Sequence, residues 1–482
     1  MVRSTRSSYQ TSFSAAILSG LSSDGGLFVP QENPVLKLNQ SWLNLSYRQL
    51  AVEVLSHYLV EFTLREIETI VDSSYSDEAF PYGETRMDDY SGFSLLRLDQ
   101  GPTLAFKDMA LVMLPHLVQA AKQKEGVAKR IVFLTATSGD TGGAAMAGFR
   151  SYEDGYLIVL YPTHGISDIQ RRQMHQAETA NCRLIPVEGN FDDCQRLVKQ
   201  AFQEIKIPNT VLSSTNSMNI GRLLPQIVYY VHAYLQVVRS GAITFGDCLD
   251  VYVPTGNFGN ILAAYYAKNM GVPLGRLIGA TNQNDVVHQF IQSGVYDIRR
   301  PFTPSLSPAM DILVSSNLER LLFDLYDGSV QDISALMEQL QAKKVYQVSP
   351  QVLTRIRETF DSAMVNESAT IAAIRRFYAQ FHRLIDPHTA VAYGAYLQKQ
   401  DPSRHALVVS TASPFKFPEA MFQAFGLSRQ VPLDVQYHQL ESLDPTYADP
   451  RAKELYQPQE ESKGIMPDRV LALIREMAGE WS

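Results

Sequence analysis

The chain has 482 residues, of which 45% are hydrophobic and 19% are charged, and its formal net charge at pH 7 is −8. This length predicts about three domains, and the balance is typical of a water-soluble globular protein with a large core. The acidic residues are scattered and no basic patch indicates nucleic-acid binding, although a local site can still bind a small anion. The three cysteines are too few for a disulfide framework and favour a reducing compartment. No apolar run approaches the roughly 18 residues of a membrane span.

The N-terminal segment reads MVRSTRSSYQTSFSAAILSGLSSDGG, and it has no acidic residue before Asp24. Such a serine-rich, basic composition is typical of an organelle transit peptide. The alternative, which we favour from the residues alone, is a folded segment that lacks acidic residues. Residues 1 to about 95 are predicted to be mainly helix and loop, and the clearest amphipathic pattern runs from Ser46 to Leu64.

From about residue 94 onward, short apolar runs alternate with helical patterns. The predicted strands are Ile131–Thr135, Tyr156–Tyr161, Arg183–Val187, Leu249–Val253, Arg276–Ala280 and His405–Ser410. The predicted helices are Thr141–Arg150, Asp168–Ala180, Asp192–Ile205, Ile220–Val238 and Asn260–Met270. This alternation predicts an α/β fold with parallel sheets. Ligands of such sheets bind beyond the carboxyl ends of the strands, in the turns that lead into helices. The polar stretch from Gln436 to Lys463 is predicted to wrap the surface.

The stretch GPTLAFKDMA places Lys107 at a predicted helix start. The first turn of a helix carries about half a positive charge, so a cation is unfavourable there. Lys107 either extends into solvent or is needed at a position where its charged form is costly.

Three turns between a strand and a helix have residues suited to anions. The first, in VYVPTGNFGNILAAYYA, is Gly256-Asn257-Phe258-Gly259-Asn260, whose glycines and helix N–H groups suit a phosphate. It matches neither the P-loop nor the dinucleotide fingerprint, and a tight glycine-capped turn is the alternative. The second, in VFLTATSGDTGGAAMAG, combines Ser138, Gly139 and Thr141 at a helix start and suits a carboxylate.

The third turn lies in SSTNSMNIGRLLPQIVYY, where Asn216, Ser217, Asn219 and Arg222 precede an apolar helix. Arginine can hold a phosphate or a carboxylate with two parallel hydrogen bonds. Considered singly, the second and third turns are equally well explained as capped helix starts.

Together these turns and Lys107 point to pyridoxal phosphate, which needs a phosphate cradle, a Schiff-base lysine and a partner for its ring nitrogen. The partner is sought in LVVSTASPFKF, where a strand ends at Ser410 and Thr411. A hydroxyl at that position would leave the ring nitrogen largely unprotonated, and an ordinary turn residue is the alternative for Thr411.

At this level of detail the chain resembles threonine synthases of the long bacterial and fungal branch, fold type II pyridoxal-phosphate enzymes related to the tryptophan synthase β subunit. The resemblance covers nearly the whole chain through STR, SDGGLFVP, PTLAFKD, TSGDTGGAA, ISDIQRRQM, GNFDDCQ, NSMNIGRLLPQIVYY, PTGNFGN, ATNQNDVV, MDILVSSNLERLLF, DPHTAVA and STASPFKF. In that family the serine-rich N-terminus is part of the folded enzyme, so the resemblance argues against a transit peptide.

The resemblance implies a role for each matching residue. Lys107 would form the Schiff base, Thr411 would face the ring nitrogen, and the cofactor phosphate would lie on Gly256, Asn257, Phe258, Gly259 and Asn260. The substrate carboxylate would be held by Ser138, Gly139 and Thr141, and its phosphate by Asn216, Ser217, Asn219 and Arg222. The chain departs from the family at Ile220 and Gly221, where an aromatic residue and alanine are usual, and at Ser413, where histidine is common.

The family reaction, which the resemblance implies here, converts O-phospho-L-homoserine and water to L-threonine and phosphate, the last step of threonine biosynthesis. Lys107 would remove the α proton and move protons at the β carbon, and for this its amine must be partly neutral. Burial beside Phe106 and the helix N-terminus are both expected to disfavour the ammonium form. The alternatives are a related phospho-lyase that releases 2-oxobutyrate, ammonia and phosphate, and a relative that has kept the fold only for binding.

The resemblance also implies an N-terminal domain of residues 1–95, a small α/β domain of residues 126–239, and a large cofactor-binding domain of residues 96–125 and 240–482. The active site would lie between the last two, and the smaller would close on the substrate. We expect a cytoplasmic enzyme, a monomer rather than a homodimer, with a small-molecule substrate and no nucleic-acid or membrane partner. The scattered histidines suggest no metal site.

Overall fold

The computed structural model describes residues 1–150, 152, 155–164, 166–458 and 463–481. Its larger sheet has six strands, all parallel except the last pair, in the order β14 (Phe360–Met364), β11 (Leu274–Thr281), β10 (Leu249–Pro254), β15 (Ala406–Ser410), β5 (Phe93–Arg97) and β4 (Arg86–Tyr90). Its smaller sheet is fully parallel, in the order β8 (Cys182–Val187), β7 (Tyr156–Pro162), β6 (Arg130–Ala136) and β9 (Thr210–Ser214). The α/β class with parallel sheets is therefore confirmed.

Each of the six predicted strands overlaps one of these strands. Four of the five predicted helices agree with the structure to within one or two residues, namely α6 (Asp140–Arg150), α8 (Phe191–Glu204), η2 (Ile220–Arg222) with α9 (Leu224–Arg239), and α10 (Gly259–Asn269). The fifth, α7 (Asp168–Gln176), ends earlier than expected. The Asn181 amide donates to the carbonyls of Phe149, Tyr152 and Gly155, which fixes a turn before β8 begins.

The N-terminal segment is folded, as the resemblance implied. Strand β1 (Val2–Ser4) lies between β2 (Gln10–Thr11) and β3 (Phe28–Pro30) in an antiparallel sheet. The next two side chains attach it to a distant helix, because Thr5 and Arg6 both bond to Glu319 in α12 (Leu318–Leu325). The STR motif is therefore structural in this chain.

The amphipathic pattern from Ser46 to Leu64 forms a shorter helix than its length suggests. Helix α2 (Tyr47–Ser56) begins with a capping box formed by Ser46 and Gln49, and α3 (Leu64–Ser74) begins with another formed by Thr63 and Glu66. The segment between them is not helical, although Leu59 and Phe62 are buried in it. The other N-terminal elements are α1 (Phe13–Ser19) and η1 (Gln40–Asn44).

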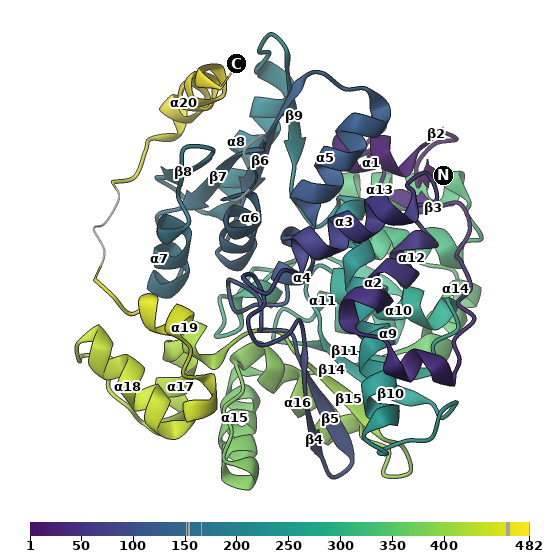
Figure 1. Cartoon of the computed structure of the whole chain (residues 1–482), viewed down its shortest axis with the longest axis vertical. Coiled ribbons are helices and arrows are strands. Elements are labelled where there is room, and N and C mark those ends of the chain that lie inside the picture. The colour runs from purple at the N-terminus through teal and green to yellow at the C-terminus, as the bar shows by residue number, and fades with distance from the viewer. Residues whose placement is uncertain (151, 153–154, 165, 459–462, 482) are drawn as a thin grey trace.

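Helices pack around both sheets (Figure 1). Most side chains of helix α9 are buried. The remaining helices in this part of the chain are α4 (Asp108–Leu111), α5 (Leu114–Glu125), α11 (Val286–Ser293), η3 (Pro308–Met310), α13 (Val330–Lys343), α14 (Pro350–Thr359), α15 (Glu367–Phe381) and α16 (Pro387–Lys399). This part of the chain also contains a two-stranded antiparallel sheet of β12 (Val295–Asp297) and β13 (Val345–Gln347).

The C-terminal part runs from the larger sheet to the smaller one. It contains η4 (Pro414–Lys416), α17 (Pro418–Phe425), α18 (Leu433–Leu443), η5 (Pro445–Tyr447), α19 (Pro450–Glu454) and α20 (Pro467–Glu480). Of the stretch from Gln436 to Lys463, residues 459–462 lie outside the described residues, and most of the rest is helical. Helix α20 packs beside α8 of the smaller sheet, far from α17 and α18 (Figure 1), although the expected division places it in the large domain.

Candidate active site

Lys107 directly precedes helix α4, at the end of the loop that follows β5, as the sequence predicted. Its side chain is only 12% exposed, and its amine Nζ lies 3.6 Å from Oδ2 of Asp140. Burial lowers the pKa of Lys107; the Asp140 carboxylate opposes this, and the cations Lys416 and Arg222 lower the pKa further. The net effect lowers the pKa of Lys107, which makes the neutral amine, the form that can act as a nucleophile or base, easier to reach.

The loop that holds Lys107 is joined to the end of β15, which brings Lys107 and Thr411 together. Phe106 N donates to Thr411 O at 2.8 Å, and Ser413 N donates to Leu104 O at 2.9 Å. Leu104 adopts a left-handed backbone conformation with φ of 57°, which is strained for a branched side chain. Thr411 N in turn donates to Thr389 Oγ1 at 3.2 Å. The main chain of Thr411 is thus fixed from both sides, and the position of its buried hydroxyl is fixed with it.

The glycine loop follows β10, the neighbour of β15, at the same edge of the larger sheet. Its carbonyls are bound from one side, because Ser315 Oγ donates to Gly256 O at 2.7 Å and Asn317 N donates to Asn257 O at 3.2 Å. A Cβ on Gly256 would lie 2.7 Å from Ala309 O, so only glycine fits. No backbone N–H from residue 256 to 260 donates to another described residue. Phe258 has φ of 63° and caps α10.

The side chain of Asn260 also has a free donor at this loop. Its Oδ1 accepts from the hydroxyls of Tyr229 at 2.8 Å and Tyr230 at 2.5 Å. Its Nδ2 is buried with no hydrogen-bond partner, which is costly unless a ligand accepts the bond. Free N–H groups at a helix start, a side-chain donor and a position where only glycine fits together suit a phosphate. The loop therefore fits the phosphate of pyridoxal phosphate.

The Ser138 loop follows β6 and begins helix α6. Gly139 has φ of 136°, a conformation that favours glycine, and its N–H donates to Thr137 Oγ1 at 3.0 Å. The backbone N–H groups of Ser138, Asp140 and Thr141 have no acceptor among the described residues, so they are available to an anion. The contact between Asp140 and Lys107 places this loop beside the amine.

Arg222 is a buried cation next to Lys107 with no carboxylate partner among the described residues. It is 5% exposed, its Nη1 donates to Thr215 O at 3.1 Å, and its Nε has no partner. Burial lowers its pKa to about 10. Nearby, the Ser217 hydroxyl lies 3.5 Å from that of Ser316. A buried guanidinium with a free donor suits an anionic ligand.

Asn216 and Asn219 differ in how far their side chains are engaged. Asn219 accepts from Gly221 N at 2.9 Å and donates to Ile17 O at 2.9 Å, so both of its polar groups are used within the protein. Asn216 N donates to Ser214 Oγ at 3.2 Å, and Asn216 is partly exposed. The geometry leaves Asn216, Ser217 and Arg222 open to a ligand and gives Asn219 the place of a cap.

Two charged residues of the site were not predicted. Asp140 and Lys416 form a buried ion pair at 2.9 Å, and Asp140 also contacts Lys107. Both lie inside motifs that carried the resemblance, TSGDTGGAA and STASPFKF. Charged residues in an apolar or glycine-rich motif are the only signal in the sequence that could have found them.

The three departures from the family pattern are accommodated by packing. Ile220 is buried in the core, and a Cβ on Gly221 would lie 3.0 Å from Leu114 Cδ1, so alanine would be tight there. Ser413 accepts from Phe415 N at 3.4 Å and borders a cavity of about 260 Å³. Ser413 also caps η4, the turn that contains Lys416, and Ile220 and Gly221 share η2 with Arg222.

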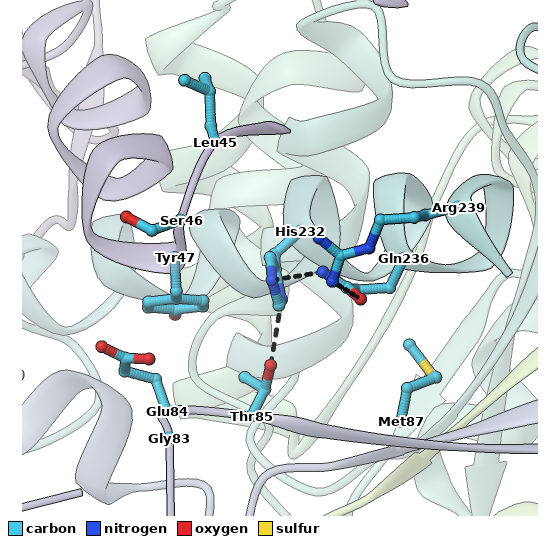
Figure 2. A pocket seen from close by; sticks show the side chains of 10 residues that line it. All are labelled: Leu45, Ser46, Tyr47, Gly83, Glu84, Thr85, Met87, His232, Gln236 and Arg239. Atoms are coloured by element: carbon cyan, nitrogen blue, oxygen red, sulfur yellow. Dashed lines mark hydrogen bonds between the residues drawn. The ribbon is translucent and has the colours of Figure 1, made fainter. Parts of the chain in front are cut away.

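A second cavity, of about 290 Å³, lies apart from Lys107 between α2, α9 and the segment before β4 (Figure 2). His232 lies between Thr85 Oγ1 at 3.0 Å and Gln236 Nε2 at 2.8 Å, and burial lowers its pKa to about 4. The ring is therefore neutral near pH 7, with Gln236 donating to Nε2 and Nδ1–H donating to Thr85. These polar groups satisfy each other, and none of the predicted site residues lines this cavity.

The part of the chain that the structure describes contains neither a candidate metal cluster nor a candidate membrane-spanning helix. No group of three or more His, Cys, Asp or Glu side chains is arranged to hold a metal ion. None of the helices in this part of the chain has the length and apolar character needed to span a bilayer.

Comparison with known proteins identifies the family. Residues 2–75 match the family described as threonine synthase N terminus, and residues 86–412 match the pyridoxal-phosphate dependent enzyme family. The chain is 39% identical to threonine synthase of Pseudomonas aeruginosa, over 86% of this chain and 87% of that one. It is 36% identical to threonine synthase-like 1 of Homo sapiens, over 86% of this chain and 58% of that longer protein.

The fold agrees with a solved structure. The crystal structure of threonine synthase from Brucella melitensis with bound pyridoxal phosphate matches with a TM-score of 0.87 and 33% identity, over 99% of both chains. The cradle, the buried lysine and these matches agree on a pyridoxal-phosphate enzyme of fold type II. This chain belongs to the threonine synthase family.

Proposed function

We propose that this chain converts O-phospho-L-homoserine and water into L-threonine and phosphate, as the resemblance implied. The observation that carries the proposal is the buried Lys107 amine beside Arg222, a buried cation that has no anion within the described protein. A site for an amine-containing substrate with a second anionic group needs both features. The membership of the chain in the threonine synthase family supports the same substrate.

The glycine loop and Thr411 hold the cofactor in this proposal. The free N–H groups of residues 256–260 and Asn260 Nδ2 would bind its phosphate, and the Thr411 hydroxyl would face its ring nitrogen. Pyridoxal phosphate, when bound, supplies an aldehyde that bonds reversibly to amines and a ring that withdraws electrons from the α carbon. A neutral hydroxyl does not protonate the ring nitrogen, which moderates that withdrawal.

The substrate is held at its two ends by different elements. The N–H groups of the Ser138 loop, with the Ser138 and Thr141 hydroxyls, bind the carboxylate, and Gly139 gives the loop its shape. Arg222, Asn216 and Ser217 bind the phosphate, and Asn219 fixes the turn that presents them. Because both ends are fixed, the α and β carbons stay within reach of one amine.

Lys107 moves the protons. Its amine would remove a proton from the α carbon and one from the β carbon, and would return protons to the γ carbon that loses phosphate and to the α carbon, while water adds at the β carbon. Phosphate leaves from the γ carbon toward Arg222. The buried position of Lys107 keeps bulk water from protonating the amine and from diverting the substrate.

The resemblance to threonine synthase-like 1 supports a second candidate, a phospho-lyase that yields 2-oxobutyrate, ammonia and phosphate. The two reactions use the same residues up to the loss of phosphate. They differ in whether water adds at the β carbon before the amino acid is released.

Product analysis separates the two candidates. The purified protein with pyridoxal phosphate is incubated with O-phospho-L-homoserine, and phosphate, threonine and keto acid are measured together. We expect phosphate and threonine in equal amounts, with Lys107→Ala as the inactive control. Keto acid equal to phosphate without threonine would establish the lyase, and no phosphate release would contradict both.

We also propose that the enzyme is a monomer in the cytoplasm. Its three cysteines are free, which suits a reducing compartment. We propose the three domains 1–95, 126–239, and 96–125 with 240–482, with the active site between the last two, except that β4 and β5 pair within the larger sheet and α20 packs on the smaller one. The Lys107–Asp140 contact crosses that proposed boundary. Closure of the smaller domain would bring Ser138 and Arg222 onto the substrate.

A further inference from the structure

A buried charge pair lies beside Lys107 that the proposed reaction does not yet use. Asp140 Oδ2 lies 3.6 Å from Lys107 Nζ, and Asp140 Oδ1 lies 2.9 Å from Lys416 Nζ. Lys416 is fully buried in η4, and its amine also donates to Thr103 O at 2.8 Å. Gln170 Nε2 donates to Asp140 Oδ1 at 3.0 Å. One carboxylate therefore bridges two lysines from different parts of the chain.

We propose that Asp140 and Lys416 are positioning residues that act through Lys107: Asp140 holds its amine in place, and Lys416 cancels the Asp140 charge so that Lys107 can release its proton. The inference deepens the proposed function and rests on the role of Lys107 in it. Neither Asp140 nor Lys416 takes a proton from the substrate.

The argument is one of charge balance in a buried site. With Lys416 present, the Asp140 carboxylate is already neutralised, so Asp140, Lys416 and Lys107 together have no net charge when Lys107 is neutral and an excess positive charge when Lys107 is protonated. Without Lys416, the same carboxylate would be neutralised only by the Lys107 ammonium. Since buried sites disfavour uncompensated charge, Lys416 decides which form of Lys107 is preferred.

The other charged groups around the pair are one cation, Arg222, and one carboxylate, Asp108. Arg222 faces Lys107 and disfavours its protonation. Asp108 faces Lys416, but its carboxylate is occupied by Thr103, which donates from N at 2.8 Å and from Oγ1 at 2.5 Å. The pKa of Asp140 lies well below its usual range, chiefly because Lys416 and then Lys107 oppose the effect of burial. Asp140 thus remains charged while Lys107 titrates.

The geometry also explains why Asp140 does not trap the amine. The Lys416 contact is shorter than the Lys107 contact, and Gln170 donates to the same oxygen as Lys416. Asp140 is therefore oriented by Lys416 and Gln170, and presents its second oxygen to Lys107 at a distance longer than a strong hydrogen bond.

The test compares Lys416→Met with Asp140→Asn in the full-length holoenzyme. Two profiles are measured against pH: kcat for O-phospho-L-homoserine, and the visible absorption of the cofactor linked to Lys107, which needs no turnover. Loss of Lys416 is expected to shift the acidic limb of both profiles upward by about one pH unit or more, because Asp140 then favours the protonated form. Loss of the Asp140 charge is expected to shift both downward by a similar amount.

Three variants complete the design. Lys416→Arg keeps the cation and is expected to restore the wild-type profile, and Lys416→Gln tests the upward shift again if methionine prevents folding. Lys268→Met is the matched control. Lys268 is a partly buried lysine in the last turn of α10, at the end away from the glycine loop, and it donates to the backbone carbonyls of Leu274 and Gly275. It is expected to leave both profiles unchanged.

A purely structural ion pair would not produce shifts of opposite sign. Shifts in the same direction, or none in either variant, would overturn the inference. If the absorption profile shifts as expected but no variant and no wild-type protein turns over O-phospho-L-homoserine, the proposed function fails while the role of the pair stands.

Discussion

Arg222 gives the sharpest test of the substrate site, because the ligand-free protein does not benefit from its charge. The guanidinium is buried, one of its nitrogens has no partner, and no carboxylate neutralises it among the described residues. Its pKa falls from 12.5 to about 10 through burial, which corresponds to roughly 3 kcal/mol of unfavourable free energy for the charged form. Arg222→Met removes that cost and keeps most of the side-chain volume.

We expect this variant to be more stable than the wild-type enzyme and much less active. The free energy of unfolding without ligand should rise by about 1–2 kcal/mol, since lost packing offsets part of the gain. The value of kcat/KM for O-phospho-L-homoserine should fall by a factor of roughly 10²–10⁴, because a charge-assisted pair to a phosphate contributes about 3–5 kcal/mol when buried. Stabilisation of the protein against heat by inorganic phosphate should disappear.

The assay pairs denaturant unfolding with steady-state kinetics, and Arg320→Met is the matched control. Arg320 is also a fully buried arginine, but it donates to Phe28 O, Met218 O and Asn317 Oδ1. Its loss should destabilise the protein by about 3 kcal/mol or more. A destabilised Arg222→Met variant that keeps kcat/KM within a few-fold of the wild type would refute the assignment of Arg222 to the substrate phosphate.

Three further predictions address the cradle, the cap and the second cavity. Gly256→Ala should weaken cofactor binding at least about tenfold, because the added Cβ would lie 2.7 Å from Ala309 O. Fluorescence titration measures the affinity, and an unchanged value would contradict the role of the glycine loop in binding the cofactor phosphate. Asn219→Ala should lower the unfolding free energy by about 1 kcal/mol while changing kcat/KM less than about threefold, and a large kinetic loss would instead place Asn219 on the substrate. The pKa of His232 is lowered from 6.5 to about 4, so the unfolded chain binds more protons and stability falls as pH drops from 6.5 to 4. In His232→Gln the fall of melting temperature over that window should be smaller, and an identical fall would show that other groups cause it.

The sequence predicted where the candidate site residues stand in the fold. The glycine loop, Lys107 and Thr411 were proposed because each stands at a strand end or helix start, where few residue types can do the required chemistry, and the structure places them at such positions. Four strands of the two larger sheets, β4, β5, β9 and β14, were not predicted. Strands β4, β9 and β14 lie at the edge of a sheet, where one side pairs with nothing. Strand β5 is buried inside the larger sheet, but its five residues fall at the end of the segment that was expected to be helix and loop.

The amphipathic stretch from Ser46 to Leu64 shows a different limit. Its apolar spacing continues through Leu59 and Phe62, which are buried in a loop rather than in a helix. Periodicity reports which residues are buried, and the capping box at Thr63 was the signal that a new helix begins there. Similarly, asparagine is a residue type suited to binding an anion, but the side chain of Asn219 caps η2. Only the folded structure could show this contact.

The cause of the lowered proton affinity of Lys107 was also only partly foreseen. Phe106 and the helix N-terminus were expected to disfavour the ammonium form. The Phe106 ring lies 5.7 Å from the amine, where a cation–π contact weakly favours the charged form, and α4 has only four residues, too few for a strong dipole.

The pKa of Lys107 is therefore set by burial and by the charges of Asp140, Lys416 and Arg222, which come from three separate segments of the chain. In the proposed mechanism Lys107 can act as a base because it is buried and because two other cations share its pocket with one carboxylate. If the helix dipole of α4 were the main cause of the lowered pKa of Lys107, a proline that interrupts α4 would raise that pKa more than Lys416→Met does. We expect instead that Lys416→Met raises it more.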